Sequence, residues 1–303
     1  MWFDPAIVET TRDAFPEWTA FLFATLSYFG SVWFLAPAVV LAYWFCDRYR
    51  FAPWLGVVMG GYALMIGIKS IFAVPRPGVG PAVTPADLPT IAALFYAQLV
   101  EVETSSFPSG HALAAVVIWG MFALESDRGT FRMRVAVAGI ITTLVAFSRV
   151  TVGVHYPVDV VVGLAVGLTY LLGALFLVDW LGTDAHDRGT IAFTLAAILA
   201  VAAFLLSGDP KAATLIGGSL GSLTAWRWLS PPRTPWPLTA KGVVFALAGI
   251  VSLGVVAPAL MVLGTNTVLV AVGFASSVLV VGFPTLVRTV GRPIRRAKPP
   301  ADH

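Results

Sequence analysis

Residues 160–178 read VVVGLAVGLTYLLGALFLV, a run of 19 residues without a charged side chain. A helix needs about 20 consecutive apolar residues to cross the hydrocarbon core of a bilayer. The run therefore predicts a membrane-spanning helix, and Asp159 stands directly at its edge. Similar uncharged runs occur elsewhere in the chain, at 18–46, 51–68, 104–124, 189–208, 212–226 and 242–287.

The expected number of spans is nine. Residues 135–148 lead into Arg149 and are interpreted as a further span, and the 46 residues of 242–287 are too long for one crossing. The turn residues at 264–267 predict two helices there, so the last span is placed at about 267–287 and the first at about 18–45. The chain is 58% hydrophobic and 12% charged, with a mean hydropathy of +0.85. These values favour an all-α, polytopic integral membrane helix bundle.

The basic residues predict how the chain crosses the membrane. With the amino terminus outside, 14 of the 19 lysine and arginine residues fall in inside segments and five fall outside. Because cytoplasmic loops carry an excess of basic residues, we expect residues 1–17 outside and a basic cytoplasmic tail at 288–303. No cleaved leader is expected, because the amino terminus is acidic. The tail is interpreted as an anchor on anionic headgroups, in preference to a nucleic-acid site.

Three short stretches place ionisable residues at the edges of apolar runs, where a charge is costly and usually functional. They are Lys69 to Pro77 (KSIFAVPRP), Pro108 to His111 (PSGH), and Ser148 to Asp159 (SRVTVGVHYPVD). The predicted topology places all three on the same, non-cytoplasmic face. Three cations, two histidines and a carboxylate indicate a site for a multiply charged anion, and phosphate is the obvious candidate.

The first stretch contains two cations that are seven residues apart. If the helix persists, Lys69 and Arg76 lie within about 20° of one face, and Pro75 and Pro77 end the span. The alternative is that both side chains extend to lipid headgroups. In the second stretch, Ser109 is expected to cap the third span, leaving N–H groups of the Gly110 region free for an anion near His111. An ordinary capped helix is the alternative.

The third stretch predicts a histidine–carboxylate pair. His155 and Asp159 are four residues apart, and Pro157 suits the first turn of a helix, so both side chains are expected on one face. Asp159 would accept the N–H of one imidazole nitrogen and leave the other nucleophilic. A structural hydrogen-bonded pair is the alternative, and the nearby Arg149 favours the catalytic interpretation.

The three stretches fit KxxxxxxRP, PSGH and SRxxxxxHxxxD at every defined position, over roughly residues 50–180. Together they resemble the type-2 phosphatidic acid phosphatase superfamily, the integral-membrane lipid phosphatases related to vanadium haloperoxidases. The resemblance implies a six-helix-type membrane phosphatase core at 18–182, followed by additional C-terminal transmembrane helices at 189–287. Two spans are counted before the first motif, whereas many family members have three.

The resemblance also implies a reaction and its residues. His155 would attack phosphorus, Asp159 would orient it, and His111 would protonate the leaving group. The phosphoryl oxygens would be held by Lys69, Arg76, Ser109, Gly110 and Arg149. The expected activity is metal-independent hydrolysis of a lipid phosphomonoester or a polyprenyl diphosphate through a phosphohistidine, without a cofactor. A phosphotransferase with the same site, or a non-catalytic lipid transporter or binding protein, remains as an alternative.

Three smaller expectations complete the interpretation. Residues 74–103 form the longest outside loop, where an apolar repeat from Leu88 to Leu99 predicts a short interfacial helix. It would cover the edge of the site or, as the second possibility, admit lipid. His186 is expected to be solvated and is not expected to bind metal. A haloperoxidase activity is the least favoured, because those relatives are soluble, and the oligomeric state is left open.

Overall fold

The computed structural model describes residues 2–100, 104–229 and 265–290, and these ranges contain helices and no strand. The helices that come before the second motif are α1 Pro5–Asp13, α2 Thr19–Ser27, η1 Tyr28–Gly30, α3 Val32–Phe45, α4 Arg48–Phe72, η2 Pro85–Asp87 and α5 Thr90–Val100. The helices that follow are α6 Gly110–Glu125, α7 Phe131–Thr151, α8 Pro157–Leu181, α9 Ala185–Ser207, α10 Pro210–Leu229 and α12 Asn266–Val290.

Five of these helices are long and apolar enough to cross a membrane, namely α4, α7, α8, α9 and α12, and the pair α2 and α3 makes a sixth candidate. The expected membrane helix bundle is therefore confirmed. Eight of the nine expected spans correspond to helices of the described ranges, although two of these helices, α6 and α10, are not among the candidates for crossing a membrane. The ninth, in the first part of 242–287, falls outside the described residues, as does most of the tail.

Two expected spans differ from the prediction. The first is broken at Ser31, where α2 and α3 meet at 43°, because Ser31 leaves helical geometry and its side chain caps α3 by accepting the Trp33 N–H. The third begins at Gly110 instead of 104 and has only 16 residues. Residues 104–109 lead instead to the N-cap Ser109 in an extended conformation, since Pro108 disfavours helix before it.

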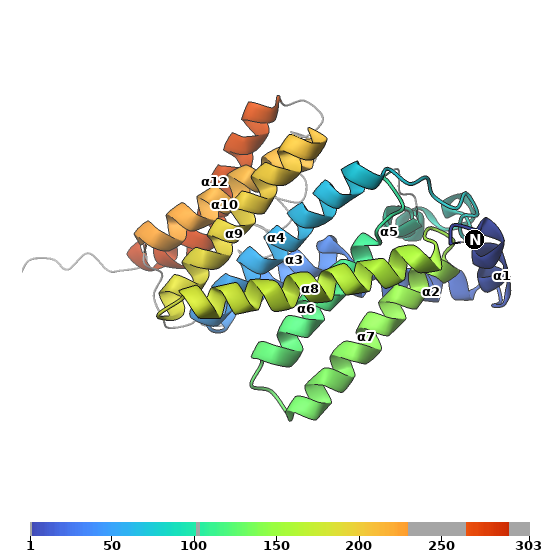
Figure 1. Cartoon of the computed structure of the whole chain (residues 1–303), viewed down its shortest axis with the longest axis horizontal. Helices are drawn as coiled ribbons and strands as arrows, with labels where there is room; N and C mark the ends of the chain where they lie inside the picture. Colours follow the sequence, from blue (N-terminus) through green and yellow to red (C-terminus); the bar gives the residue numbers. More distant parts are fainter. Residues whose placement is uncertain (1, 101–103, 230–264, 291–303) are drawn as a thin grey trace, which may run out of the picture.

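The helices form two groups on either side of α4 (Figure 1). Helices α6, α7 and α8 pack against one another, and α9, α10 and α12 form the second group. Small residues allow close contacts between helices, as is usual in membrane bundles. A Cβ at Gly56 would lie 2.6 Å from the backbone of Ala192, so α4 and α9 meet nearly backbone to backbone. The main core lies around this contact and includes the buried Phe193 and Trp226.

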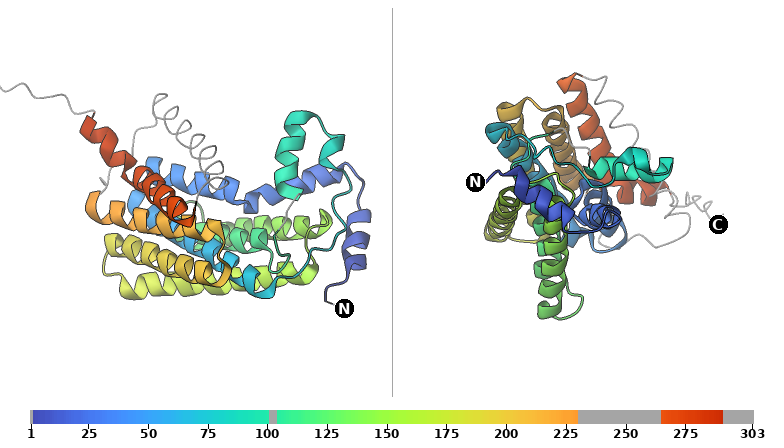
Figure 2. Two further views of the ribbon diagram at one scale, coloured as in Figure 1. Left: turned by 90° about the horizontal axis from the view of Figure 1, so that it is seen from above. Right: turned by 90° about the vertical axis from the view of Figure 1, so that its right-hand side faces the viewer.

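The short helix predicted in the 74–103 loop is confirmed as α5, which stands out from the bundle beside α2 (Figure 2), and its position at the membrane interface stays a prediction. It buries Tyr96 and Leu99 against α2, and it exposes Ile91 and Leu94. Near it, α1 packs on α7, and the Phe3 ring meets the ring of Tyr156 at 5.3 Å. The amino-terminal segment therefore lies at the end of the bundle that carries the three motifs.

The opposite end of the bundle carries the loops that the sequence assigns to the inside. Ion pairs join these loops, with Arg50 at 3.0 Å from Asp127 and Arg188 at 3.0 Å from Glu125. His186 is not simply solvated as expected. It is half-buried and stacks on Trp226 at 5.1 Å, because the start of α9 packs beside the end of α10.

Candidate active site

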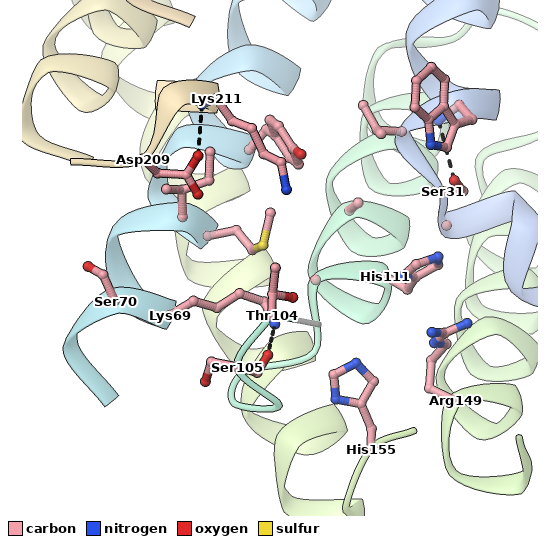
Figure 3. Close-up of a pocket in the computed structure, with 18 of the residues that line it drawn as sticks. Ser31, Lys69, Ser70, Thr104, Ser105, His111, Arg149, His155, Asp209 and Lys211 are labelled. Atoms are coloured by element: carbon pink, nitrogen blue, oxygen red, sulfur yellow. Dashed lines mark hydrogen bonds between the residues drawn. The ribbon is translucent and has the colours of Figure 1, made fainter. Parts of the chain in front are cut away.

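The structure brings the three motifs to one cavity of about 500 Å³ (Figure 3). Six of the eight predicted site residues line it, namely Lys69, Arg76, Gly110, His111, Arg149 and His155. The other two, Ser109 and Asp159, are fully buried next to lining residues. Residues that are up to 86 positions apart in the chain thus share one space, as the predicted topology required.

His155 and Asp159 form the expected pair, with 3.2 Å between His155 Nδ1 and Asp159 Oδ2. The pair forms across the start of α8, because His155 precedes the N-cap Tyr156 and Asp159 lies in the first turn. The expectation that both side chains lie on one helix face is therefore wrong, because only Asp159 belongs to α8. Asp159 Oδ2 also accepts the Tyr156 backbone N–H at 2.8 Å, which fixes the carboxylate in place.

This arrangement determines the protonation of His155. An Nδ1–H that donates to Asp159 leaves Nε2 as the unprotonated nitrogen of the ring. Burial, together with the charges of Arg76 and Arg149, holds the pKa of His155 well below its ordinary value. The imidazole is therefore neutral at pH 7 and has a free lone pair for a nucleophilic attack.

The turn between Arg149 and His155 sets the position of the imidazole. The Arg149 carbonyl accepts the backbone N–H groups of Val154 and His155, at 3.3 and 3.2 Å. Gly153 lies in the left-handed region with φ +78°, a conformation that glycine adopts without strain. The short segment after α7 therefore holds the cation and the imidazole of the third motif at one wall of the cavity.

Sequence reasoning missed Ser106, which is fully buried beside the pair. Its hydroxyl donates to Asp159 Oδ2 and lies 3.4 Å from His155 Nδ1. Three consecutive hydroxyl residues, Thr104, Ser105 and Ser106, precede the second motif and are separated from it by Phe107. A run of hydroxyl residues near a motif with ionisable side chains was the feature of the sequence that could have indicated a role for Ser106.

The first motif reaches the site differently from the prediction. Helix α4 ends at Phe72, and Ala73 adopts the left-handed conformation with φ 45°, so Arg76 lies on a loop. The helix stops early because the residue before Pro75 disfavours helical geometry. Arg76 donates to the carbonyls of Val154 at 2.6 Å and Thr104 at 2.9 Å. Burial lowers its pKa to about 10, and it remains a cation at pH 7.

Lys69 and Arg149 complete the set of cations. The Lys69 ammonium donates to the Ser105 carbonyl. Arg149 is fully buried, and its guanidinium donates to Ser27 Oγ at 2.9 Å and to the Leu99 carbonyl at 3.0 Å. Within the described ranges, neither these two nor Arg76 has a carboxylate oxygen within 4.0 Å.

The second motif provides the N-terminus of α6, with Ser109 as the N-cap as predicted. The Ser109 backbone N–H donates to the Asp159 carbonyl at 2.9 Å, which ties the starts of α6 and α8 together. Gly163 permits this approach, since a Cβ there would lie 2.6 Å from the Ser109 carbonyl oxygen. The contact places His111 on the first turn of α6, at the cavity wall.

Four buried polar atoms at the site have no hydrogen-bond partner among the described residues. They are Ser109 Oγ, His111 Nε2, Arg149 Nε and Asp159 Oδ1. Buried polar atoms are nearly always paired, so a group of unpaired ones next to a cavity indicates a polar ligand. Three of the four can bind or protonate an oxyanion, and the fourth belongs to the carboxylate that orients His155.

The cavity has a wall that the sequence did not predict. Ser207, Asp209 and Lys211, from the connection between α9 and α10, line it together with the motif residues. The apolar residues Val32 and Met65 also line it, from α3 and α4. In the described parts of the chain, no three His, Cys, Asp or Glu side chains lie close enough together to hold a metal ion.

Comparison with known proteins supports the resemblance seen in the sequence. Residues 50–183 match the model of the PAP2 superfamily. A curated relative, phosphatidylglycerophosphatase B of Bacillus subtilis (strain 168), is 37% identical over 79 residues, which are 24% of this chain and 39% of that protein. The match thus spans about two fifths of the relative's length. The solved structure of Aquifex aeolicus LpxE aligns with a TM-score of 0.41 and 20% identity, over 57% of this chain and 94% of that one.

Residues 50–183, which match the PAP2 superfamily model, contain all three motifs.

Proposed function

We propose that this protein is an integral-membrane lipid phosphatase, which hydrolyses a lipid phosphomonoester or a polyprenyl diphosphate through a phosphohistidine. The observation that carries the proposal is one cavity that joins two histidines to three cations, and these cations have no carboxylate partner in the described part of the chain. Binding an anion would compensate these charges, and buried charges are rarely left uncompensated. The match of residues 50–183 to the PAP2 superfamily supports the same reaction class.

The first step is the transfer of the phosphoryl group to His155. The unprotonated Nε2 attacks phosphorus, an N–P bond forms, and the bond from phosphorus to the leaving oxygen breaks. His111, which is protonated once the bound phosphate offsets the charges of the nearby cations, gives its proton to that oxygen, which leaves as the lipid alcohol or, from a diphosphate, as the lipid monophosphate. Asp159 holds Nδ1–H and stabilises the positive charge that develops on the ring.

The second step releases phosphate. His111, now neutral, takes a proton from water, the oxygen of the water attacks phosphorus, and the N–P bond breaks. Lys69, Arg76 and Arg149, with Ser109 and the Gly110 N–H, hold the phosphoryl oxygens through both steps. Cationic groups around these oxygens are the main requirement of phosphoryl transfer, because charge spreads over them in the transition state.

The walls of the cavity suit a lipid. A smaller space of about 30 Å³ adjoins it, and Tyr62, Met65 and Ala114 line both spaces. The remaining lining of the smaller space is apolar, and it includes Leu35 and Leu113 from α3 and α6. We infer that the phosphate occupies the cationic part while an alkyl chain leaves along this apolar side, between helices and towards the bilayer.

The proposal extends to sidedness and metal use. The motifs and the paired inside loops lie at opposite ends of the bundle, so a cytoplasmic position of these loops places the site at the outer leaflet. The reaction is proposed to need no metal, because the single carboxylate of the motifs, Asp159, is engaged with His155, Ser106 and Tyr156.

Phosphate release by the purified protein tests the proposal. We expect release from a lipid monophosphate or a polyprenyl diphosphate in the presence of EDTA, and a loss of about 10⁴-fold or more in His155→Ala, since it removes the nucleophile. Arg227→Gln, an exposed residue far along α10, serves as the matched control and keeps its activity. Normal release by His155→Ala would contradict the mechanism, and a loss in EDTA that added metal restores would contradict metal independence.

A further inference from the structure

Lys211 lies on the cavity although it belongs to the additional C-terminal helices, outside the segment that matches the family. The connection that carries it has a defined geometry. Helix α9 ends at Gly208, which adopts φ +62°, and Ser207 Oγ accepts the Asp209 N–H at 3.0 Å. Asp209 Oδ1 in turn accepts the Lys211 backbone N–H at 2.7 Å. The first turn of α10 is therefore fixed relative to α9.

The two helices also fix Lys211 relative to the catalytic groups. Helix α9 packs along most of α4, whose last turn carries Lys69. Figure 3 shows the Lys211 side chain extending into the cavity from the side opposite His155, with Lys69 and Thr104 between them. The cavity thus has one cationic end around Arg149 and His155 and a second end at Lys211.

The Lys211 ammonium has no counter-ion among the described residues, where no carboxylate oxygen lies within 4.0 Å of it. Asp209, the carboxylate that lines this end of the cavity, uses Oδ1 to cap α10. Lys69 is a like charge on the same cavity and adds repulsion. The exposed Lys211 is a point charge with freely rotating donors, a type of group that proteins use to bind phosphate.

We propose that Lys211 forms a second anion subsite, which binds a second phosphate group of the lipid substrate. This inference rests on the proposed function and narrows its substrate class to lipids that carry two phosphorus groups. The reacting phosphate lies at His155 between Lys69, Arg76 and Arg149, and the second one lies towards Lys211. A diphosphate and a phosphomonoester linked to a phosphodiester share this chemistry, and they differ in the spacing of their charges.

The test compares three substrates in detergent micelles at low salt. They are a lipid with one phosphomonoester, a polyprenyl diphosphate, and a lipid with a terminal phosphomonoester and an internal phosphodiester. Lys211→Met removes the charge with little change in shape, Lys211→Arg keeps it, and Arg227→Gln is the control on the same helix. At an exposed position such as that of Lys211, loss of one hydrogen-bonding contact corresponds to about 3- to 10-fold in affinity.

We expect Lys211→Met to raise KM by about this factor for the substrates with two phosphorus groups, with kcat retained. KM for the single phosphomonoester stays within about twofold, and Lys211→Arg restores the wild-type values. Of the two substrates with two phosphorus groups, the one whose KM increases more identifies the distance between phosphate groups that the subsite fits. An equal increase in KM for all three substrates would overturn the subsite. Unchanged KM values for all three would also overturn it, and would mean that Lys211 only faces headgroups or water.

Binding without turnover separates this inference from the proposed function. Equilibrium binding of the same three lipids is measured in His155→Ala and in His155→Ala combined with Lys211→Met. A loss of affinity that is confined to the lipids with two phosphorus groups supports the subsite. It does so even if the wild-type protein releases no phosphate, a result that would contradict only the proposed phosphatase function. Equal binding of each lipid by the two variants would refute the subsite.

Discussion

The two ends of the bundle differ in how they hold their basic side chains. At the end of the inside loops, Arg50 and Arg188 meet carboxylates and are partly exposed. At the end of the motifs, Arg76 and Arg149 meet carbonyl and hydroxyl oxygens instead, and Arg149 is fully buried. Carbonyl groups orient a guanidinium without neutralising it. Among these four arginines, the comparison separates ion-paired cations that stabilise the fold from cations that are kept for a ligand. Arg134, at the inside end, also donates to the carbonyls of Ala123 and Gly129, so the distinguishing feature of Arg149 is its full burial at the cavity.

The largest test of this comparison exchanges one arginine at each end for methionine. Arg149→Met is expected to lower kcat/KM by about 10²- to 10³-fold, because it removes a group that stabilises transition-state charge. Arg188→Met at the other end keeps the activity within about twofold and loses about 1 kcal/mol of stability with its partly exposed ion pairs. Phosphate release and thermal unfolding measure the two effects.

The second part of this test measures the thermal stability of Arg149→Met. Arg149 is buried without a carboxylate partner among the described residues, and burying such a charge is costly, so its removal is expected to be close to neutral or stabilising. The midpoint of thermal unfolding of Arg149→Met is therefore expected to equal or exceed that of the wild type when no phosphate is present. A clear decrease of this midpoint, with activity retained, would show that Arg149 serves the fold and that the two ends are alike.

The pH dependence of stability gives the next smaller effect. The folded pKa of His155 lies below its ordinary value, which is about 6.5 in the unfolded chain. Below that pH the unfolded state binds a proton that the folded state does not, so stability is complete above about pH 6.5 and falls on acidification, by at most about 1.4 kcal/mol per pH unit. Denaturation between pH 7.5 and 5, compared with His155→Gln, isolates this contribution. Equal slopes for the two proteins would contradict it.

The smallest predicted effect concerns Ser106. Ser106→Ala removes one hydrogen bond to Asp159, and we expect about a fivefold decrease in kcat, since such a bond contributes about 1 kcal/mol. Asp159 keeps its bonds to Tyr156 and His155, so KM should change little. Ser126→Ala, at the far end of α6, serves as the control. An unchanged kcat would remove Ser106 from the groups that position the pair.

Much of the site could be predicted because its chemistry is local in sequence. The His155 and Asp159 spacing and the N-cap position of Ser109 depend on neighbouring residues. The structure pairs His155 with Asp159 and places Ser109 at the N-cap, although the pair shares no helix face and the Ser109 side chain makes no capping bond. The position of Arg76 could not be predicted in the same way. Helix α4 does not continue to Arg76, because Ala73 adopts the left-handed conformation and ends the helix before Pro75. Where apolar runs are long, as in α8 and α9, the expected spans and the observed helices agree closely.

The missed residues depend on contacts between distant segments. Ser27, on α2, reaches Arg149 only because the first span breaks at Ser31 and α2 packs on α7. Lys211 reaches the cavity through the packing of α9 on α4. A partial signal existed, since Lys211 and Arg12 are the two outside basic residues that belong to no motif. Arg12 pairs with Glu9 and Asp13, whereas Lys211 faces the cavity.

The lining of the cavity by Ser207 and Lys211 has a consequence for any attempt to shorten this protein. A fragment that stops after Leu181 would retain every motif residue and nearly all of the family-matched segment. It would nevertheless lose the wall of the cavity that Ser207 and Lys211 form. The face of α4 that packs against α9 would also become exposed. We therefore expect the smallest active fragment to extend at least into α10, beyond the end of the family-matched segment.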